Sequence, residues 1–282
     1  SASRFYLEYV HDDIFGWDAQ SRTAVHSADG TIATGLIELP HLVGSLELIA
    51  AEGPSALHTG DLAKLISNDV IDRGGILGRR DLSTYKPVVR PSLMTTVGEW
   101  KLGTNPPPSV GGVCVSAMLR LLDDHPSDDL ERLVRVQRAV LGHRLEVLDH
   151  SDDLERDAAA FLALIDRDHL AVLESGSTAH VSATDSDGGA CAVTVSSGYS
   201  SGMIARGTGI WLNNCLGEQE LNAKGLHGLT PGTRLLSNMA PTVGHHPDGS
   251  SIAIGSPGAD RITTAIVQVL AGFINGGLGL QE

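Results

Sequence analysis

A chain of 282 residues with a hydrophobic share of 41% is long enough to bury one large core or two of ordinary size. Its formal net charge of -14 leaves no basic face for a nucleic-acid backbone, so we expect no nucleic-acid partner. Its apolar runs all end well short of the ~20 residues that cross a bilayer, which predicts no membrane partner.

Helical periodicity dominates the first part of the chain. In 40–52, Leu42, Val43, Leu46, Ile49 and Ala50 share one helical face, which predicts a helix. Strand composition follows in 88–97 and 100–103, and the proline-rich stretch 105–112 predicts an irregular loop. The predicted helices of this part are 40–52, 55–73, 113–122, 128–148 and 152–165.

The composition changes after residue 176, where Gly, Ser and Thr increase and alternation with period 2 replaces the helical period. Asp187, Gly188 and Gly189 separate two alternating runs, which predicts a β-hairpin of strands 180–184 and 190–196. Further strands are expected at 209–213 and 251–254, and a helix at 261–273. This change in composition is the clearest boundary between two parts of the chain that the sequence indicates.

The cysteines Cys114, Cys191 and Cys215 are an odd number and have no CxxC or CxxH spacing. The pattern favours neither a disulfide framework nor a structural zinc site, and we expect three small buried hydrophobic side chains. His245 and His246 resemble a metal pair only superficially, because adjacent strand residues point to opposite faces. We expect a solvated loop there, and neither a metal nor a cofactor.

A Ser177-Thr178 pair stands at the head of the predicted hairpin, after the flexible residues 174–176. A threonine is common in strands, and this is the simpler interpretation of the pair alone. However, an N-terminal threonine can perform acyl transfer unaided, because its own neutral amine accepts the hydroxyl proton. Such a threonine must first be released by cleavage of the bond between Ser177 and Thr178.

The surrounding motifs resemble those of γ-glutamyltransferases, a family of N-terminal nucleophile hydrolases. Five motifs occur in the family's order and rough spacing, and the upstream segments 46–63 and 106–112 are similar to its large-subunit helices and loop. The five are TAHVS (178–182), the hairpin turn at 187–189, GIWLNN (209–214), RLLSNMAPT (234–242) and GSPGADRI (255–262). The resemblance implies an α+β fold, the four-layer αββα sandwich, with a large-subunit part at 1–177 and a small catalytic part at 178–282.

The resemblance also implies roles for individual residues. Thr178 would be the nucleophile, with its amine as the base. Ser196 stands where the family has a threonine whose hydroxyl assists processing. Gly258 and Ala259 match a glycine pair whose backbone N–H groups form the oxyanion hole, where each donor contributes about 3–4 kcal/mol.

The residues that would hold the substrate depart from the family pattern. Gly198 replaces an asparagine, Glu218 lengthens an acidic side chain, and Ser237 with Asn238 replaces a serine pair. Asn214 lies in a loop that borders the substrate in the family, although it could equally be a turn former. Loss of a buried hydrogen-bonding partner typically costs about 1–3 kcal/mol, so these changes indicate an altered substrate.

Three functions are compatible with these motifs. The leading one is an autoprocessing enzyme that transfers or hydrolyses γ-glutamyl-type amides, made of large and small subunits from one precursor. A second is an atypical relative that cleaves a carbon–carbon bond in the alkylproline pathways of antibiotic biosynthesis, and a third is an inactive or uncleaved binding homologue. The partner would be a small γ-glutamyl-like or amino-acid-derived molecule, and a cytoplasmic location is favoured over secretion.

The remaining polar motifs have structural interpretations. His180 is expected to be a packed or hydrogen-bonded neighbour of the nucleophile, because the amine already supplies a base. Arg261 is expected to pair with a carboxylate such as Asp260 or Glu218. Gly111 and Gly112 indicate simple loop geometry before a helix, although a helix N-terminus could also bind an anion.

Overall fold

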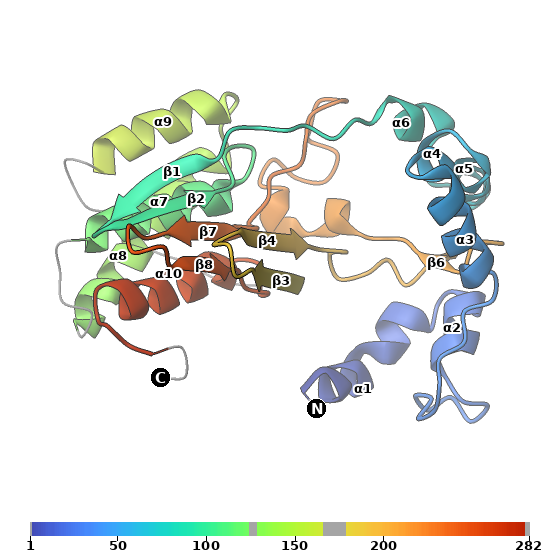
Figure 1. The fold of residues 1–282 in the computed structure, drawn as a ribbon. Helices are drawn as coiled ribbons and strands as arrows, with labels where there is room; N and C mark the ends of the chain where they lie inside the picture. The colour runs from blue at the N-terminus through green and yellow to red at the C-terminus, as the bar shows by residue number, and fades with distance from the viewer. Residues whose placement is uncertain (1, 124–128, 166–178, 280–282) are drawn as a thin grey trace. The chain divides into compact units, whose positions relative to one another are not determined.

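The computed structural model describes residues 2–123, 129–165 and 179–279, and the chain forms two compact units (Figure 1). The first unit contains Ser1–Val89 and Tyr199–Asn214, and the second contains Arg90–Gly198 and Cys215–Glu282. The boundary predicted at residue 177 falls inside the second unit. That boundary marks an expected cleavage of the chain, whereas the two units are defined by how compactly their residues pack. None of the described helices is long and apolar enough to cross a membrane.

The first unit is mainly helical. Its buried side chains include Leu62, Ala63 and Ile66 on one face of α5. Its elements are α1 (Ala2–Phe15), α2 (Ala19–Val25), α3 (Leu42–Glu52), α4 (Ser55–His58), α5 (Asp61–Asp72), α6 (Arg79–Thr84), β5 (Ile204–Ala205) and β6 (Ile210–Trp211). The predicted strand 209–213 is therefore the short β6, which pairs with β5.

One helix prediction in the first unit was wrong, and the helix predicted over 40–52 is present as α3. The predicted helix 55–73 is split into α4 and α5, because Gly60 is extended and lies so close to Ala56 that a side chain would not fit. In α3, Val43 is 70% exposed and Leu46 55% exposed, whereas the buried residue is Ser45, whose hydroxyl donates to the Thr208 carbonyl oxygen at 2.7 Å. Periodicity identified the helix but not its buried side.

A four-stranded antiparallel sheet organises the second unit, in the order β1-β2-β7-β8. Its strands are β1 (Leu93–Val97), β2 (Trp100–Thr104), β7 (Thr242–His245) and β8 (Ser251–Ile254). β1 begins later than the predicted residue 88, because Pro87 and Pro91 cannot donate to a ladder. β7 was not predicted, and the solvated loop expected at His245 is the end of this strand.

Helices cover one face of this sheet, as Figure 1 shows for α7 and α10. α7 is the central helix, and every residue in it except Arg120 is buried. The helices are α7 (Val110–Leu122), α8 (Leu130–His143), α9 (Leu154–Ile165) and α10 (Arg261–Ile274), with a π-helical turn at Arg144–Leu148 and 3₁₀ turns at Cys215–Gly217 and Gln219–Leu221. The predicted helix 128–148 is therefore α-helical only as far as His143, and its last turn is π-helical.

The predicted hairpin is present as β3 (Ala179–Thr184) and β4 (Ala190–Val195), and it packs against β7 and β8. Side chains of its other face are exposed, among them Val181 and Val193. Cys191 lies on that face and is exposed, so the prediction that all three cysteines are buried was wrong. In the second unit, the described residues thus stack in the order helices, sheet, hairpin.

Candidate active site

Five of the predicted site residues line one cavity of about 200 Å³ in the second unit. They come from four separate segments: the end of β4, the 3₁₀ segment, the loop before β7, and the loop before α10. The five are Ser196, Glu218, Ser237, Asn238 and Ala259. Cys215, Leu221, Leu235, Leu236, Met239 and Ile262 complete the wall.

Ser177 and Thr178 lie outside the described residues. β3 begins at Ala179, which pairs with Val195, and Ser196 is the next residue along the chain. The Ser196 hydroxyl oxygen accepts a hydrogen bond from the Gly198 N–H at 3.1 Å. Gly198 has a φ of 64°, a conformation that favours glycine, and it does not line the cavity.

Glu218 is 4% exposed, and its Oε1 has no hydrogen-bond partner within the described residues. Burial raises the pKa of this carboxyl above its ordinary value, and the nearby acids Glu220 and Asp260 act in the same direction. The neighbouring thiol of Cys215 donates to the Ser196 carbonyl oxygen at 3.8 Å, and burial raises the pKa of this thiol to about 11. The Cys215 thiol also forms a hydrogen bond with the Glu218 side chain, so it is the single oxygen Oε1 that is buried without a donor.

The loop of Ser237 and Asn238 rests on the first turn of α7. The Gly111 N–H donates to the Ser237 carbonyl oxygen at 3.2 Å, and a Cβ on Gly111 would lie 2.1 Å from the Asn238 carbonyl oxygen. A Cβ on Gly112 would lie 1.9 Å from the Asn105 carbonyl oxygen. The interpretation of these glycines as loop residues was wrong: they are helical, and they are needed for close packing.

Gly258 and Ala259 both have positive φ angles, 128° and 38°, just before α10. Their carbonyl oxygens accept from the N–H groups of Arg261 and Ile262, at 2.8 and 3.1 Å. Within the part of the chain that the structure describes, their own N–H groups donate to no acceptor. Ala259 lines the cavity, and Gly258 does not.

A buried ion cluster contacts the loop before β7 and the loop before α10. It was not predicted from the sequence. Arg144 is 2% exposed; its Nη1 lies 2.7 Å from Asp260 Oδ1 and its Nε 3.1 Å from Asp149 Oδ1. Asn238 Nδ2 donates to the same Asp260 oxygen at 2.7 Å. Burial alone would lower the pKa of Arg144, but the two carboxylates raise it, so the guanidinium stays charged.

The sequence did contain a signal for Arg144. It lies four residues from both Val140 and Leu148, on the face of the predicted helix that carries the buried leucines and valines. An arginine in such a stripe must be paired. The expected partner of Asp260 was Arg261, whereas the structure places Asp260 against Arg144 and Asn238.

Other polar residues singled out in the sequence do not line this cavity. Asn214 belongs to the first unit, where its Oδ1 accepts from the Tyr199 N–H at 3.1 Å. His180 is hydrogen-bonded, as expected, to the hydroxyls of Thr194 and Ser182, each at 2.8 Å. His246 pairs with Asp248 at 2.9 Å, and the described residues contain no group of three potential metal ligands.

Comparisons with known proteins agree with one another. Residues 27–282 match the family model described as Gamma-glutamyltranspeptidase. The glutathione hydrolase proenzyme of Escherichia coli strain K12 is 28% identical over 86% of this chain and 49% of its own length. The acylase ACY 1 proenzyme of Pseudomonas sp. strain SE83 is 25% identical over 84% of this chain and 47% of its own length.

Solved structures show the fold. The crystal structure of cephalosporin acylase from Bacillus halodurans matches with a TM-score of 0.71 and 18% identity, over 97% of this chain and 55% of that one. The α+β fold of N-terminal nucleophile hydrolases, predicted from the motifs, is confirmed. The chain spans about half the length of the curated relatives it matches.

Proposed function

We propose that this chain, which belongs to the gamma-glutamyltranspeptidase family, carries the nucleophile of an autoprocessing enzyme that hydrolyses or transfers γ-glutamyl-type acyl groups. The observation that supports this most is that Ser196, Glu218, Asn238 and Ala259, from four distant segments, line one cavity. The large and small subunits would come from one precursor. A cytoplasmic location is part of the proposal.

In the proposed reaction, cleavage between Ser177 and Thr178 frees the Thr178 amine. The neutral amine accepts the hydroxyl proton as the oxygen attacks the amide carbonyl, and the N–H groups of Gly258 and Ala259 stabilise the developing oxyanion. The C–N bond then breaks, the proton passes to the leaving amine, and an acyl ester remains. Water or a second amine attacks this ester in the same way, which restores the hydroxyl.

Two buried acceptors support an amine-bearing substrate. Glu218 Oε1 and Asn238 Oδ1 belong to residues of the cavity wall, and neither has a hydrogen-bond partner within the described residues. Unpartnered buried acceptors are costly, and a substrate ammonium group would satisfy both. The substrate that this arrangement favours therefore carries a positive charge beside the acyl group.

A second candidate is cleavage of a carbon–carbon bond beside a carbonyl, as in alkylproline pathways of antibiotic biosynthesis. It is favoured by Gly198, which has no side chain to offer a substrate and is held in a left-handed turn. An uncleaved binding homologue is a third. The carbon–carbon alternative releases no amine from an amide substrate, and the binding homologue forms no product at all.

The test is release of p-nitroaniline from γ-glutamyl-p-nitroanilide by the purified protein. We expect release by the wild type, residual release by Thr178→Ser, and none by Thr178→Ala. No release by a wild-type protein that is cleaved before Thr178 would reject amide chemistry and favour the carbon–carbon alternative. Release that persists in Thr178→Ala would reject the assigned nucleophile.

A further inference from the structure

The turn that carries Glu218 places a thiol beside its carboxyl group. After the 3₁₀ turn Cys215–Gly217, the Glu218 N–H donates to the Cys215 carbonyl oxygen at 3.3 Å. Residues three apart in a 3₁₀ turn lie one above the other, so both side chains leave the turn on the same side. Both line the cavity of about 200 Å³, and the thiol forms a hydrogen bond with the Glu218 carboxyl.

The Cys215 thiol is a donor at neutral pH. Burial raises its pKa to about 11, so the sulfur keeps its proton. This single proton has two acceptors, the Glu218 carboxyl and the Ser196 carbonyl oxygen, which lies 3.8 Å from Sγ. A hydrogen bond to an ionised carboxylate is stronger than one to a neutral carbonyl, so the thiol donates to Glu218 whenever that group is charged.

The backbone of Glu218 is held separately, by Asn222. The side-chain Nδ2 of this buried asparagine donates to the carbonyl oxygens of Leu216 and Glu218, each at 2.9 Å. The Leu221 N–H donates to the same Glu218 oxygen at 3.1 Å. Because these contacts fix the main chain, what remains free is the rotation of the Glu218 side chain, and the thiol restricts that rotation.

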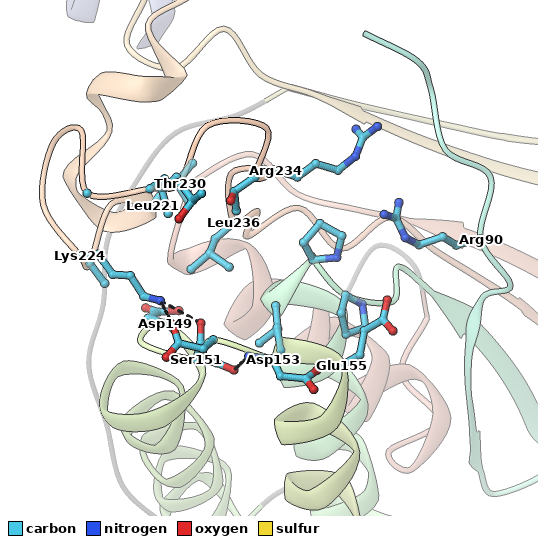
Figure 2. A pocket seen from close by; sticks show the side chains of 18 residues that line it. Arg90, Asp149, Ser151, Asp153, Glu155, Leu221, Lys224, Thr230, Arg234 and Leu236 are labelled. Carbon is cyan, nitrogen blue, oxygen red and sulfur yellow. Dashed lines mark hydrogen bonds and ion pairs between the residues drawn. The ribbon is translucent and has the colours of Figure 1, made fainter. Parts of the chain in front are cut away.

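Within the described part of the chain, no lysine or arginine forms an ion pair with Glu218. A lysine does lie beyond the cavity wall. Leu221 and Leu236 also line an adjoining cavity of about 590 Å³, to which Lys224 belongs (Figure 2). Lys224 Nζ lies 2.6 Å from Asp152 Oδ1, so its charge is already balanced there.

The other groups around Glu218 oppose its ionisation. Burial raises its pKa, and so do the negative charges of Glu220 and Asp260. Arg144, the cation nearest to Asp260, is shared between two carboxylates. Among the groups that shift the pKa of Glu218 within the described residues, the Cys215 thiol is the one that favours the ionised form.

We propose that Cys215 is a positioning residue for substrate binding. Its thiol donates to one oxygen of the Glu218 carboxylate and leaves the other oxygen, Oε1, to accept the ammonium group of the substrate. The inference rests on the proposed function, since the ligand is the amine-bearing substrate proposed above. The thiol itself takes no part in making or breaking bonds.

The first experiment follows the ionisation of Glu218 without any substrate. NMR of protein labelled at the glutamate side-chain carboxyl carbon gives a titration curve for each glutamate, and the curve that Glu218→Gln lacks belongs to Glu218. We expect the midpoint of this curve to move to higher pH in Cys215→Ala, because the donor that favours the carboxylate is lost. Cys215→Ser keeps an O–H donor and should return the midpoint towards the wild-type value.

Cys191→Ala is the matched control, because it removes an exposed thiol that does not line the cavity. The midpoint of Glu218 should be the same in this variant as in the wild type. An unmoved midpoint in a folded Cys215→Ala variant, checked by circular dichroism, would overturn the proposal.

The second experiment measures KM and kcat for γ-glutamyl-p-nitroanilide across a range of pH. The ammonium group binds the ionised form of Glu218, so KM rises as the pH falls through the pKa of this carboxyl. We expect Cys215→Ala to raise KM about tenfold at neutral pH, to shift this acidic limb to higher pH, and to change kcat far less. A loss confined to kcat, with the acidic limb unmoved, would also overturn the proposal.

The two experiments separate this inference from the proposed function. A midpoint that moves in Cys215→Ala, in a protein that releases no p-nitroaniline, would reject the proposed function and leave the link between thiol and carboxyl standing. Release of p-nitroaniline by a protein whose midpoint does not move would support the function and overturn the inference.

Discussion

At Glu218, the demands of folding and of binding oppose each other. Its carboxyl is buried, one oxygen has no partner within the described residues, and burial raises its pKa above the ordinary value of 4.5. Because the folded state holds the proton more tightly than the unfolded state, this group stabilises the fold at low pH. That contribution is lost as the pH rises through the raised folded-state pKa.

Glu218→Gln removes the charge and keeps the shape. We expect the variant to be more stable than the wild type at neutral pH and about equal to it at acidic pH, as measured by urea unfolding at both values. Affinity for an amine-bearing substrate should fall by about 1–3 kcal/mol, which is roughly five- to 150-fold. Glu220→Gln, two residues further on, is the control, and the same stability gain in that variant would contradict this explanation.

At the scale of elements, the first turn of α7 depends on two glycines because carbonyl oxygens of other segments approach its backbone. Gly112→Ala would place a Cβ 1.9 Å from the Asn105 carbonyl oxygen. We expect the free energy of unfolding to fall by about 1–3 kcal/mol, because backbone atoms must move to relieve the contact.

Gly44→Ala in α3 is the matched control. No atom of another segment lies within 4 Å of the position that its Cβ would take, and alanine is a better helix former than glycine. Thermal unfolding should show a gain of up to about 1 kcal/mol for this variant. A Gly112→Ala variant as stable as the wild type would mean that α7 is not packed as described.

The π-helical turn carries Arg144, which links Asp260 before α10 to Asp149. Arg144→Met would leave two buried carboxylates without their cation, which typically costs about 3–5 kcal/mol. Denaturant unfolding is the measurement, and Arg135→Met on the exposed face of α8 is the control. A cost below about 1 kcal/mol, the size of a surface ion pair, would contradict the burial of this cluster.

Sequence patterns predicted some elements and not others, for physical reasons. Period-2 alternation around Asp187 and Gly188 defined the hairpin, because that signal is local. β7 escaped prediction because its four residues, which include Gly244 and His245, contain too little alternation to distinguish a strand from a loop. The exposed Val43 in α3 shows that an apolar stripe predicts a helix but not whether another segment covers it.

Across the whole molecule, the division into two units could not be read from the sequence. Tyr199–Asn214 leaves the second unit and joins the first, and no change in composition marks that excursion. The family resemblance places Asn214 and Glu218 at one substrate site, and the structure assigns Asn214 to the first unit and Glu218 to the second. The candidate site was predictable only through the family motifs, because its cavity joins segments from β4 to α10 that no spacing rule connects.

The proposed chemistry depends on one event, in which Thr178 becomes a catalyst because the bond before it is cut. Intact-mass spectrometry of the purified wild-type protein measures this event itself. We expect two polypeptides, the second of which begins at Thr178, and a single uncut chain for Thr178→Ala. A wild-type protein that stays whole during incubation at neutral pH, or is cut at another bond, would contradict the proposal.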